Sequence, residues 1–491
     1  MTYEPVIGLE IHAELNTRTK MFCDSLNDPD ETHPNVNVCP ICIGHPGTLP
    51  VINRAAVRNV IQVGLAVKGE IAPFTQFERK NYFYPDLPKG YQISQYQHPL
   101  VRGGYLEIET PDSGAQTRRV RIQRVHLEED TGRLMHDAKT KTTLVDFNRA
   151  GIPLLELVTE PDCRSAAEAR RVAEELQRIL HYLGVSGANM EKGEMRIEAN
   201  VSLRPAGTHK LGTKVELKNI NSFRFMEQAV AYEIGRQTEL LGRSEAVRQE
   251  TRGWDEERGQ TVSQRSKEES HDYRYFPEPD LPPLRIEPEL VEELRASLPE
   301  LPAEKLRRFR TEFGIDRTLA GTLVGDKRLA GFFEAAVSEL NQWLTSTGGR
   351  ATDANVIQLA ANYLTTDVMR LLGGGSIASS RLTPENFAEL ITYLAGGRIS
   401  SRVAKDVLKE MVSSGADPSV IIDEQGLWQV SRGGDLEEAV TAAIAANPKA
   451  ADDFRAGKTT ALQFLLGQVM KESRGANPIA VRKLLEEKLA P

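Results

Sequence analysis

The feature that most constrains the fold is a period-two alternation of apolar and polar side chains in roughly the first 290 residues. It is present in segments 6–15, 194–204 and 213–217. In segment 6–15, Ile7 and Leu9 alternate with polar residues that include Glu10 and His12. Successive side chains of a strand point to opposite faces, so we expect Glu10 and His12 on one face. The pattern predicts a sheet-rich domain of the α+β class.

A helix is expected between these strands. Ser165, followed three residues later by Glu168, forms a capping-box pattern, and Gly184 is a typical helix stop. Apolar residues such as Val172 and Leu176 recur at helical spacing between the two ends.

The sequence pattern changes near residue 290. After the proline-rich stretch 277–288, residues 290–298 and 303–313 have helical patterns, and Pro302 is a favourable helix start. A glycine-rich loop at 373–376 separates two further helical stretches. The rest of the chain is therefore expected to be helical.

The last segment, from about residue 407, has a marked charge polarity. Residues 410–453 include nine acidic and two basic side chains, whereas residues 455–488 include seven basic and three acidic ones. The basic end contains Lys458, Lys471 and Arg474 and is a candidate nucleic-acid contact. The alternative is a solvated helical face.

Composition limits the remaining choices. A chain of 491 residues is expected to form about two to four domains, and 40% hydrophobic with 26% charged residues is typical of a soluble globular protein. No apolar run is long enough to span a bilayer and the N-terminus lacks signal-peptide features, so a cytoplasmic location is expected. The net charge of −8 argues against electrostatic binding of nucleic acid by the whole protein surface.

Two runs, 79–88 and 272–283, interleave aromatic rings, cations and prolines. This density is unusual for a helix or a half-buried strand, so each run is expected to be an ordered loop with its rings near the surface. Such a surface suits a substrate with flat groups and phosphates. The alternative is that the rings close the ends of a sheet.

Three of the four cysteines could hold a metal. Cys39 and Cys42 have the spacing of a zinc knuckle, and Cys23 lies upstream, but Ser25 stands where a fourth cysteine would complete the set. These residues alone do not decide between a bound zinc and a reduced loop without metal.

Carboxylates recur on the polar strand faces. They are Glu10, Glu198 and Glu216, joined by the cluster at 128–130 and by Glu156. Glu156 lies between two leucines, so its buried carboxylate needs a cation, a metal or a proton. These oxygens with His12 would suit magnesium or manganese and through it nucleotide phosphates; the alternative is a set of unrelated surface glutamates.

Familiar signatures of other enzymes are absent. The stretch around Lys458 lacks the upstream glycine of a P-loop, and there is no metalloprotease or nucleophile-elbow motif. No cysteine or serine is placed to act as an acyl-transfer nucleophile. If the protein uses ammonia from an amide, another chain must release it.

Several motifs together resemble the B-subunit family of the tRNA-dependent amidotransferases, essentially from end to end. They are residues 6–12 (VIGLEIH), 79–86 (RKNYFYPD), 92–95 (QISQ), 127–130 (LEED), 146–149 (DFNR), 199–204 (ANVSLR), 216–219 (ELKN), 272–280 (DYRYFPEPD) and 464–471 (FLLGQVMK).

The resemblance implies an architecture and an assembly. A cradle-shaped catalytic domain is expected at 1–292, a helical domain at 293–406 and a small tRNA-contacting tail domain at 407–491. The implied partners are an amidase (glutaminase) chain, which releases ammonia from glutamine, and a small third chain, in a heterotrimer that binds aminoacylated tRNA(Gln) or tRNA(Asn).

The implied reaction is ATP-dependent amidation. The terminal phosphate of ATP passes to the side-chain carboxylate of Glu-tRNA(Gln) or Asp-tRNA(Asn), and ammonia then displaces it. The implied magnesium ligands are Glu10, His12, Glu129, Glu156, Glu198 and Glu216. Lys80 and Glu129 are the implied catalytic residues, with Lys80, Tyr82 and Tyr84 along the ammonia route. The first aromatic run then forms an active-site wall, and the second a domain junction.

The sequence departs from the family pattern at two places. Glu198 replaces the more usual aspartate, and its extra methylene would shift a metal ligand or admit a water. The cysteine set lacks the fourth member of zinc-bearing relatives. The competing functions are a noncatalytic tRNA-binding module and a metal-dependent nuclease.

Overall fold

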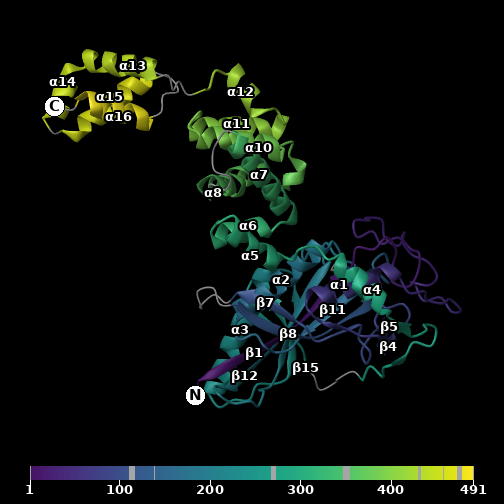
Figure 1. Ribbon diagram of the computed structural model, residues 1–491. Coiled ribbons are helices and arrows are strands. Elements are labelled where there is room, and N and C mark those ends of the chain that lie inside the picture. Colours follow the sequence, from purple (N-terminus) through teal and green to yellow (C-terminus); the bar gives the residue numbers. More distant parts are fainter. Residues whose placement is uncertain are drawn as a thin grey trace. The chain divides into compact units, whose positions relative to one another are not determined.

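The structure is a computed structural model that describes residues 2–109, 117–137, 139–266, 272–346, 354–428, 433–456, 458–472 and 478–489. The chain forms two compact units, Met1–Leu301 and Pro302–Pro491 (Figure 1). The first is sheet-rich and the second helical, which confirms the α+β prediction. No helix in the described ranges has the length and apolar character needed to cross a bilayer.

The first unit contains seventeen described strands. They are β1 (Tyr3–Glu14), β2 (Glu70–Ile71), β3 (Phe74–Thr75), β4 (Glu78–Asn81), β5 (Tyr91–Ser94), β6 (Val101–Arg102), β7 (Tyr105–Glu109), β8 (Thr117–Glu129), β9 (Arg133–Asp137), β10 (Thr142–Asp146), β11 (Pro153–Thr159), β12 (Met195–Pro205), β13 (Val215–Ile220), β14 (Glu250–Asp255), β15 (Gln260–Ser266), β16 (Phe276–Pro277) and β17 (Leu284–Arg285).

Ten of these strands form one sheet. Its order is β15-β14-β13-β12-β1-β11-β8-β6-β2, with β7 also paired to β8. Neighbouring strands are antiparallel except for β13 and β14. The other strands pair as β10-β9, β16-β4-β5 and β17-β3. Strand β1 therefore lies at the centre of the large sheet, between β11 and β12.

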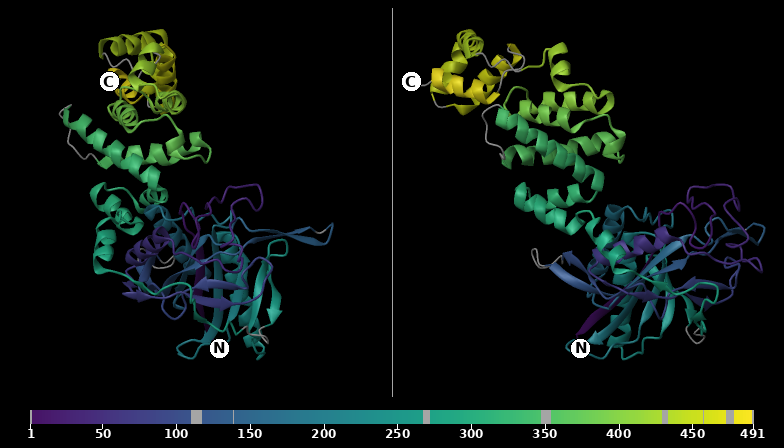
Figure 2. Two further views of the ribbon diagram at one scale, coloured as in Figure 1. Left: turned by 90° about the vertical axis from the view of Figure 1, so that its right-hand side faces the viewer. Right: turned by 45° about the vertical axis from the view of Figure 1, so that its right-hand side comes forward.

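Helices cover the apolar face of this sheet (Figures 1 and 2). They are α1 (Arg54–Ala66), α2 (Ala166–Leu183) and α3 (Phe223–Gly242), with α4 (Pro288–Ala296) packed on α1. Ile7, Leu9 and Ile11 of β1 are buried in the same core as Val172 and Leu176 of α2. The alternation expected in β1 is confirmed, so its polar residues lie on the face away from this core.

The predicted α2 ends are also confirmed. The Ser165 hydroxyl accepts a hydrogen bond from the Glu168 backbone N–H at 3.2 Å, and Gly184 ends the helix with a φ of 72°. A left-handed residue at this position costs a glycine little.

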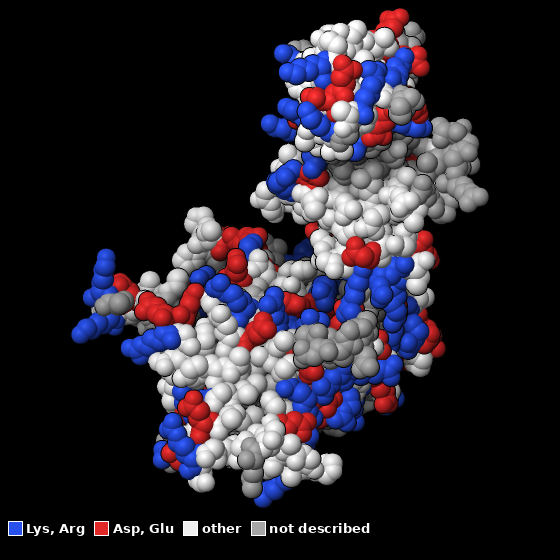
Figure 3. Space-filling view, turned by 90° about the vertical axis from the view of Figure 1, so that its left-hand side faces the viewer, with Lys and Arg blue, Asp and Glu red and all other residues white. Residues whose placement is uncertain are grey.

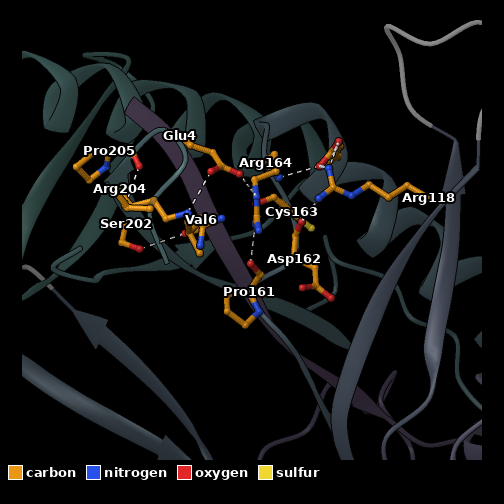
Figure 4. Close-up of polar contacts among 12 residues, drawn as sticks. Glu4, Val6, Arg118, Pro161, Asp162, Cys163, Arg164, Ser202, Arg204 and Pro205 are labelled. Carbon is orange, nitrogen blue, oxygen red and sulfur yellow. Dashed lines mark hydrogen bonds and ion pairs between the residues drawn. The ribbon is translucent and has the colours of Figure 1, made fainter. Parts of the chain in front are cut away.

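Ionic contacts fix the start of β1 to two neighbouring segments. Glu4 accepts hydrogen bonds from Arg164 Nε at 2.7 Å and from Arg204 Nε at 3.1 Å, and Arg164 Nη1 also donates to the Pro161 carbonyl (Figure 4). Glu4 thereby links β1 to β12 and to the loop before α2. This anchoring holds the strand that carries Glu10 and His12.

The two aromatic runs are neighbours in space. Strand β4 of the first run pairs with β16 of the second, with Arg79 opposite Phe276. Arg79 also forms a two-pronged hydrogen bond to buried Glu278, at 2.7 and 2.8 Å. The expectation of irregular loops is wrong for residues 78–81 and 276–277, because the backbones of the two runs pair there as antiparallel strands.

The second unit consists of α5 (Pro302–Glu312), α6 (Arg317–Val324), α7 (Lys327–Ser346), α8 (Ala354–Asn362), a π-helical turn η1 (Tyr363–Val368), α9 (Met369–Leu372), a 3₁₀ turn η2 (Ile377–Ser379), α10 (Pro384–Ala395), α11 (Ser401–Ser414), α12 (Pro418–Glu424), α13 (Gly433–Ala446), α14 (Pro448–Arg455), α15 (Thr459–Glu472) and α16 (Pro478–Leu489). Helices α13 to α16 have an apolar core of their own.

The expected domain limits at 292 and 406 lie inside helices α4 and α11. Leu294 and Leu301 pack into the core of the first unit, so that unit continues through Leu301. In α11, Ala404 and Val407 are both buried, and the helix continues without interruption through residue 406.

Candidate active site

A row of polar side chains crosses the centre of the large sheet on the face opposite the helices. His12 of β1 is paired with Glu156 of β11, which in turn is paired with His126 of β8. Glu10 and Glu128, each two residues away along its own strand, share this face. Because the register of three antiparallel strands sets these positions, they hardly depend on loop conformation.

The side chains of this row are in contact range. His12 Nε2 lies 3.3 Å from Glu156 Oε2, 3.5 Å from Glu128 Oε1 and 3.9 Å from Glu10 Oε1. His126 Nε2 lies 3.4 Å from the same Glu156 oxygen. Glu156 is 5% exposed and Glu128 is 2% exposed, which confirms the expectation that Glu156 is buried. We call these five residues, Glu10, His12, His126, Glu128 and Glu156, the carboxylate–histidine cluster.

Burial and charge together shift the titration of this cluster. Burial disfavours the charged form of His12, but its hydrogen bond to Glu156 and the charge of Glu128 raise its pKa to about 9. Burial and the charge of Glu156 raise the pKa of Glu128 to about 7. Several carboxylates forced together in this way attract a cation.

Lys80 supplies one positive charge near the cluster. Burial opposes its ammonium form, but the charges of Glu128, Tyr275 and Glu156 raise its pKa. Its Nζ lies 5.2 Å from the ring centre of Tyr273 and 5.9 Å from that of Tyr82. Lys80 therefore feels the charge of the cluster and also lies near rings from both aromatic runs.

Two further predicted carboxylates lie on the adjoining strands β12 and β13. Glu198 is paired with Glu10 across β1 and β12, and Glu198 Oε2 is 2.7 Å from Lys218 Nζ. The same Lys218 nitrogen lies 3.8 Å from Glu216 Oε1, and Glu216 accepts a hydrogen bond from the Thr251 hydroxyl at 2.8 Å. Glu198 and Glu216 therefore extend the acidic face beyond Glu10.

Glu129 does not join this face. It follows Glu128 in β8 and therefore points the other way, where it is bound by Lys89 and accepts a hydrogen bond from the Ile93 backbone N–H at 2.9 Å. Of the two adjacent glutamates, the structure brings Glu128 to His12. The resemblance implied Glu129 rather than Glu128 as a magnesium ligand, so the placement of these two side chains differs from that prediction.

The residues fit a hard divalent cation. Glu10, His12 and Glu156 each present a ligand atom within 4.8 Å of the others, and so do His126, Glu128 and Glu156. Carboxylate oxygens with an imidazole suit magnesium or manganese, which retain several waters.

A cavity of about 520 Å³ adjoins the cluster. Its lining includes Glu14, Arg196 and Glu198. Glu14 follows His12 on the same face of β1, and Arg196 is the residue paired with His12 across β1 and β12. The cavity is therefore lined by neighbours of the cluster along β1 and β12, and none of the five cluster residues is among its lining residues.

Comparison with known proteins shows the family of the chain. The GatB/GatE catalytic-domain model matches residues 5–292, and a GatB domain model matches residues 350–489. The chain belongs to the GatB/GatE family. This confirms the resemblance, and the chain is a B-type component of the tRNA-dependent amidotransferases, which are ligases.

Full-length relatives agree with the domain matches. The chain is 47% identical over 494 residues to the B subunit of the aspartyl/glutamyl-tRNA(Asn/Gln) amidotransferase of Carboxydothermus hydrogenoformans, with 99% of each chain covered. It is 46% identical over 492 residues to the protein of that name from Persephonella marina, with 100% of each covered. It is 45% identical over 498 residues to the protein of that name from Rippkaea orientalis, with 99% of this chain and 98% of the relative covered.

Other predicted site residues of this GatB/GatE chain lie away from the cluster or only border it. Tyr82 places its hydroxyl 3.5 Å from Gln92 Oε1, whereas Tyr84 is 62% exposed. Cys23, Cys39 and Cys42 form a separate group in the loops before α1. Sequence reasoning assigned no role to His126 or Lys218, although Lys218 lies two residues from the predicted ligand Glu216, and His126 lies two residues from Glu128, so each pair shares a strand face.

The predicted tRNA contacts lie in the tail. Lys458 Nζ is 2.8 Å from Asp453 Oδ1, Lys471 is exposed, and Arg474 is outside the described residues. Arg482 is likewise paired with Glu486, at 3.0 Å. The tail surface in Figure 3, at the top of the view, mixes both signs of charge. Both ion pairs join residues close together in the sequence, and basic and acidic side chains are interspersed on this surface.

Glu14 provides a test of the cavity. Burial and the neighbouring Asp130 raise the pKa of Glu14 from 4.5 to about 8. Because the folded state holds this proton more tightly than the unfolded state, the contribution of Glu14 to stability is lost as pH rises from about 4.5 to 8. Glu14→Gln removes the titration, so its stability relative to the unsubstituted protein should rise by about 1–3 kcal/mol between pH 5 and pH 9. Urea unfolding of the first unit at both pH values measures this difference in stability.

Glu191→Gln is the control, because Glu191 is exposed and lines the same cavity. It should show no such trend, and equal trends in both variants would contradict the assignment.

Proposed function

We propose that this chain uses ATP and magnesium to activate the side-chain carboxylate of Glu-tRNA(Gln) or Asp-tRNA(Asn), and then amidates it with ammonia delivered by a partner amidase subunit. The observation that carries the proposal is the buried carboxylate–histidine cluster beside Lys80 and an adjoining cavity. The relatives are named as B subunits of aspartyl/glutamyl-tRNA(Asn/Gln) amidotransferases, which supports the substrate class.

The chemistry needs an activated carboxyl group, because a carboxylate is a poor acyl donor. A carboxylate oxygen attacks the terminal phosphorus of ATP, the bond to ADP breaks, and an acyl phosphate forms. The ammonia nitrogen then attacks the carbonyl carbon, loses a proton to a base, and displaces phosphate. Both steps concentrate negative charge at one place.

The chain offers groups that fit this demand. Glu10, His12, Glu128 and Glu156 would hold magnesium, with Glu198 and Glu216 on the adjoining strands. Magnesium, when bound, would neutralise charge between the carboxylate and the triphosphate. The Lys80 ammonium faces the same space and stabilises the phosphorylated group. Rings from both aromatic runs limit the access of water on this side.

The ammonia route is proposed to pass Lys80, Tyr82 and Glu129. Glu129 lies on the opposite side of β8 from the metal ligands, where Lys89 binds it. Tyr84 is exposed and could border only the mouth of such a route. Zinc binding by Cys23, Cys39 and Cys42, which the sequence left undecided, has no role in this reaction.

Two substitutions should separate the route from the chemistry. Glu129→Gln should lower glutamine-driven amidation by about tenfold and leave amidation driven by added ammonium chloride within about twofold, because the route is bypassed. Lys80→Met should lower amidation from both nitrogen sources by at least about tenfold, since it removes charge beside Glu128 and Glu156. The measurement is the rate of amidated tRNA formation with each source. Equal loss with both sources in Glu129→Gln would contradict its assignment to the route.

Reconstitution tests the function itself. The chain is combined with its amidase and small partner subunits, ATP, magnesium, glutamine and either Glu-tRNA(Gln) or Asp-tRNA(Asn). Amidated tRNA is the expected product. Bound but unchanged tRNA without ATP cleavage would indicate a noncatalytic tRNA-binding module, and shortened tRNA a nuclease.

A further inference from the structure

A second chemical cluster lies in the loops before α1, away from the carboxylate–histidine cluster. The sulfur atoms of Cys23, Cys39 and Cys42 are within 4.8 Å of one another. Structural zinc takes four protein ligands, and among the described residues only these three come together here. Ser25 Oγ is 3.8 Å from Cys42 Sγ, where its hydroxyl is a hydrogen-bonding group rather than a usual zinc ligand. The donor set therefore does not fit a structural zinc site.

A buried lysine occupies the same cluster. Lys20 is 0% exposed, and its Nζ lies 3.8 Å from Cys42 Sγ and 3.2 Å from the Phe147 carbonyl oxygen. Burial lowers the pKa of Lys20, while the charges of the three cysteines oppose that shift. A buried ammonium needs an anion, and within the described chain none of its ion-pair partners is a carboxylate. The sulfur of Cys42 is placed to be that anion.

Other groups also stabilise a thiolate at Cys42. Its sulfur accepts a hydrogen bond from the Cys39 backbone N–H at 3.0 Å. A hydrogen bond from the Cys23 thiol, opposed by burial and helped by Cys39 and Lys20, lowers the pKa of Cys42 to about 4. The same contact raises the pKa of Cys23. The Lys20 ammonium and the Cys39 backbone N–H both contact the Cys42 sulfur, and these contacts favour ionisation of Cys42 over Cys23, whereas the Cys39 carbonyl oxygen at 3.4 Å opposes it.

Cys23 and Cys42 are 8% and 5% exposed, and both line a cavity of about 220 Å³. The cavity is also bordered by His45, Lys89 and Glu129, and it has room for a molecule as small as hydrogen peroxide. Cys163, by contrast, is 0% exposed, and burial raises its pKa to about 12. Reactivity toward oxidants follows thiolate character and access, so these cysteines should differ sharply.

We propose that Cys42 and Cys23 form a peroxide-sensitive thiol pair. The Cys42 thiolate attacks one oxygen of a hydroperoxide; the O–O bond breaks, the sulfur is oxidised to sulfenic acid, and hydroxide or alkoxide leaves and takes up a proton. The Cys23 sulfur then attacks the sulfenic sulfur, the S–O bond breaks, and water leaves with the Cys23 proton as the disulfide forms. This two-electron oxidation consumes one hydroperoxide.

Disulfide formation would change the surroundings of two cations. Lys20 would lose its buried counter-ion, and the loop that borders Lys89 and Glu129 would be cross-linked at Cys42. The contacts of the thiol pair involve no member of the carboxylate–histidine cluster, and its cavity shares only Glu129 with the proposed ammonia route.

The test is oxidation of the full-length chain with hydrogen peroxide. The protein is purified with a thiol reductant, freed of the reductant, and assayed for bound zinc. It is then treated with hydrogen peroxide, alkylated, digested and analysed by mass spectrometry. The expected result is less than about 0.1 zinc per chain, a Cys23–Cys42 disulfide, and loss of two of the four thiols, with Cys163 unmodified.

Variants identify the role of each residue. Cys39→Ser should still form the disulfide, whereas Cys23→Ser should stop at a sulfenic acid on Cys42 that dimedone traps. Lys20→Met should slow oxidation at least about tenfold, and Lys20→Arg should largely restore it. Should Lys20→Met fail to fold, the cysteine variants still decide the matter. One zinc per chain that protects the thiols, a Cys39–Cys42 bond, or unreactive Cys42 would overturn the proposal.

Discussion

Glu156→Gln should abolish tRNA-dependent ATP cleavage while leaving tRNA binding intact. Glu156 is 5% exposed, and its carboxylate lies within 3.4 Å of nitrogen atoms of His12, His126 and Arg124. The amide keeps the shape of the side chain but removes a negative charge that would hold magnesium. We expect phosphate release to fall by at least about a hundredfold, since metal charge is a large part of transition-state stabilisation.

The measurement is phosphate release by the reconstituted complex with saturating aminoacylated tRNA. Filter binding of the tRNA and glutaminase activity of the partner serve as internal controls. A matched variant is Glu293→Gln, which removes a surface carboxylate of α4 paired with Arg58 and should leave all three readings unchanged. Phosphate release by Glu156→Gln at the unsubstituted rate would rule out Glu156 as a metal ligand.

The sequence was sufficient to predict the polar face of β1 but not the whole site. Alternation within a strand depends only on the chain itself, so Glu10 and His12 could be assigned to one face before any pairing was known. Choosing between Glu128 and Glu129 requires knowing which side chains of β8 share a face of the sheet with Glu156. The pairing of His126 with Glu156 settles this in the structure, and the local signal for it is the alternation of apolar Val125 and Leu127 with His126 and Glu128.

Contacts between distant segments account for most of what was missed. The pairing of Arg79 with Phe276 joins residues almost 200 positions apart, and composition alone shows only that the two runs are similar. Lys20 gives no signal in sequence either, because lysine is usually exposed and its burial beside Cys42 depends on the loop that carries residues 39–42. By contrast, α2 was predicted correctly, since Ser165 and Gly184 define its ends locally.

Removal of the tail after Trp428 should weaken tRNA binding and leave the rest of the chain folded. Helices α13 to α16 have a separate apolar core that includes Val440, Leu465 and Val481. Trp428 itself is retained, because the Arg398 guanidinium lies 4.2 Å from its ring centre. A cut at residue 406 would instead interrupt α11 and remove the buried residues Val407 and Leu408. The later cut thus tests the tail alone.

We expect the Kd for tRNA to rise at least about tenfold in the truncated complex, with a shallower dependence on salt, because contacts between the basic side chains of the tail and phosphates are lost. Glutaminase activity of the partner should not change. Single substitutions refine the contact: Lys471→Gln should weaken binding more than Lys458→Gln, since Lys471 is exposed whereas Lys458 is paired with Asp453 at 2.8 Å. Filter binding at two salt concentrations measures all three proteins. An unchanged Kd after truncation would place the tRNA contact elsewhere on the chain, whereas a raised Kd with an unchanged salt slope would show that the tail acts through shape rather than charge.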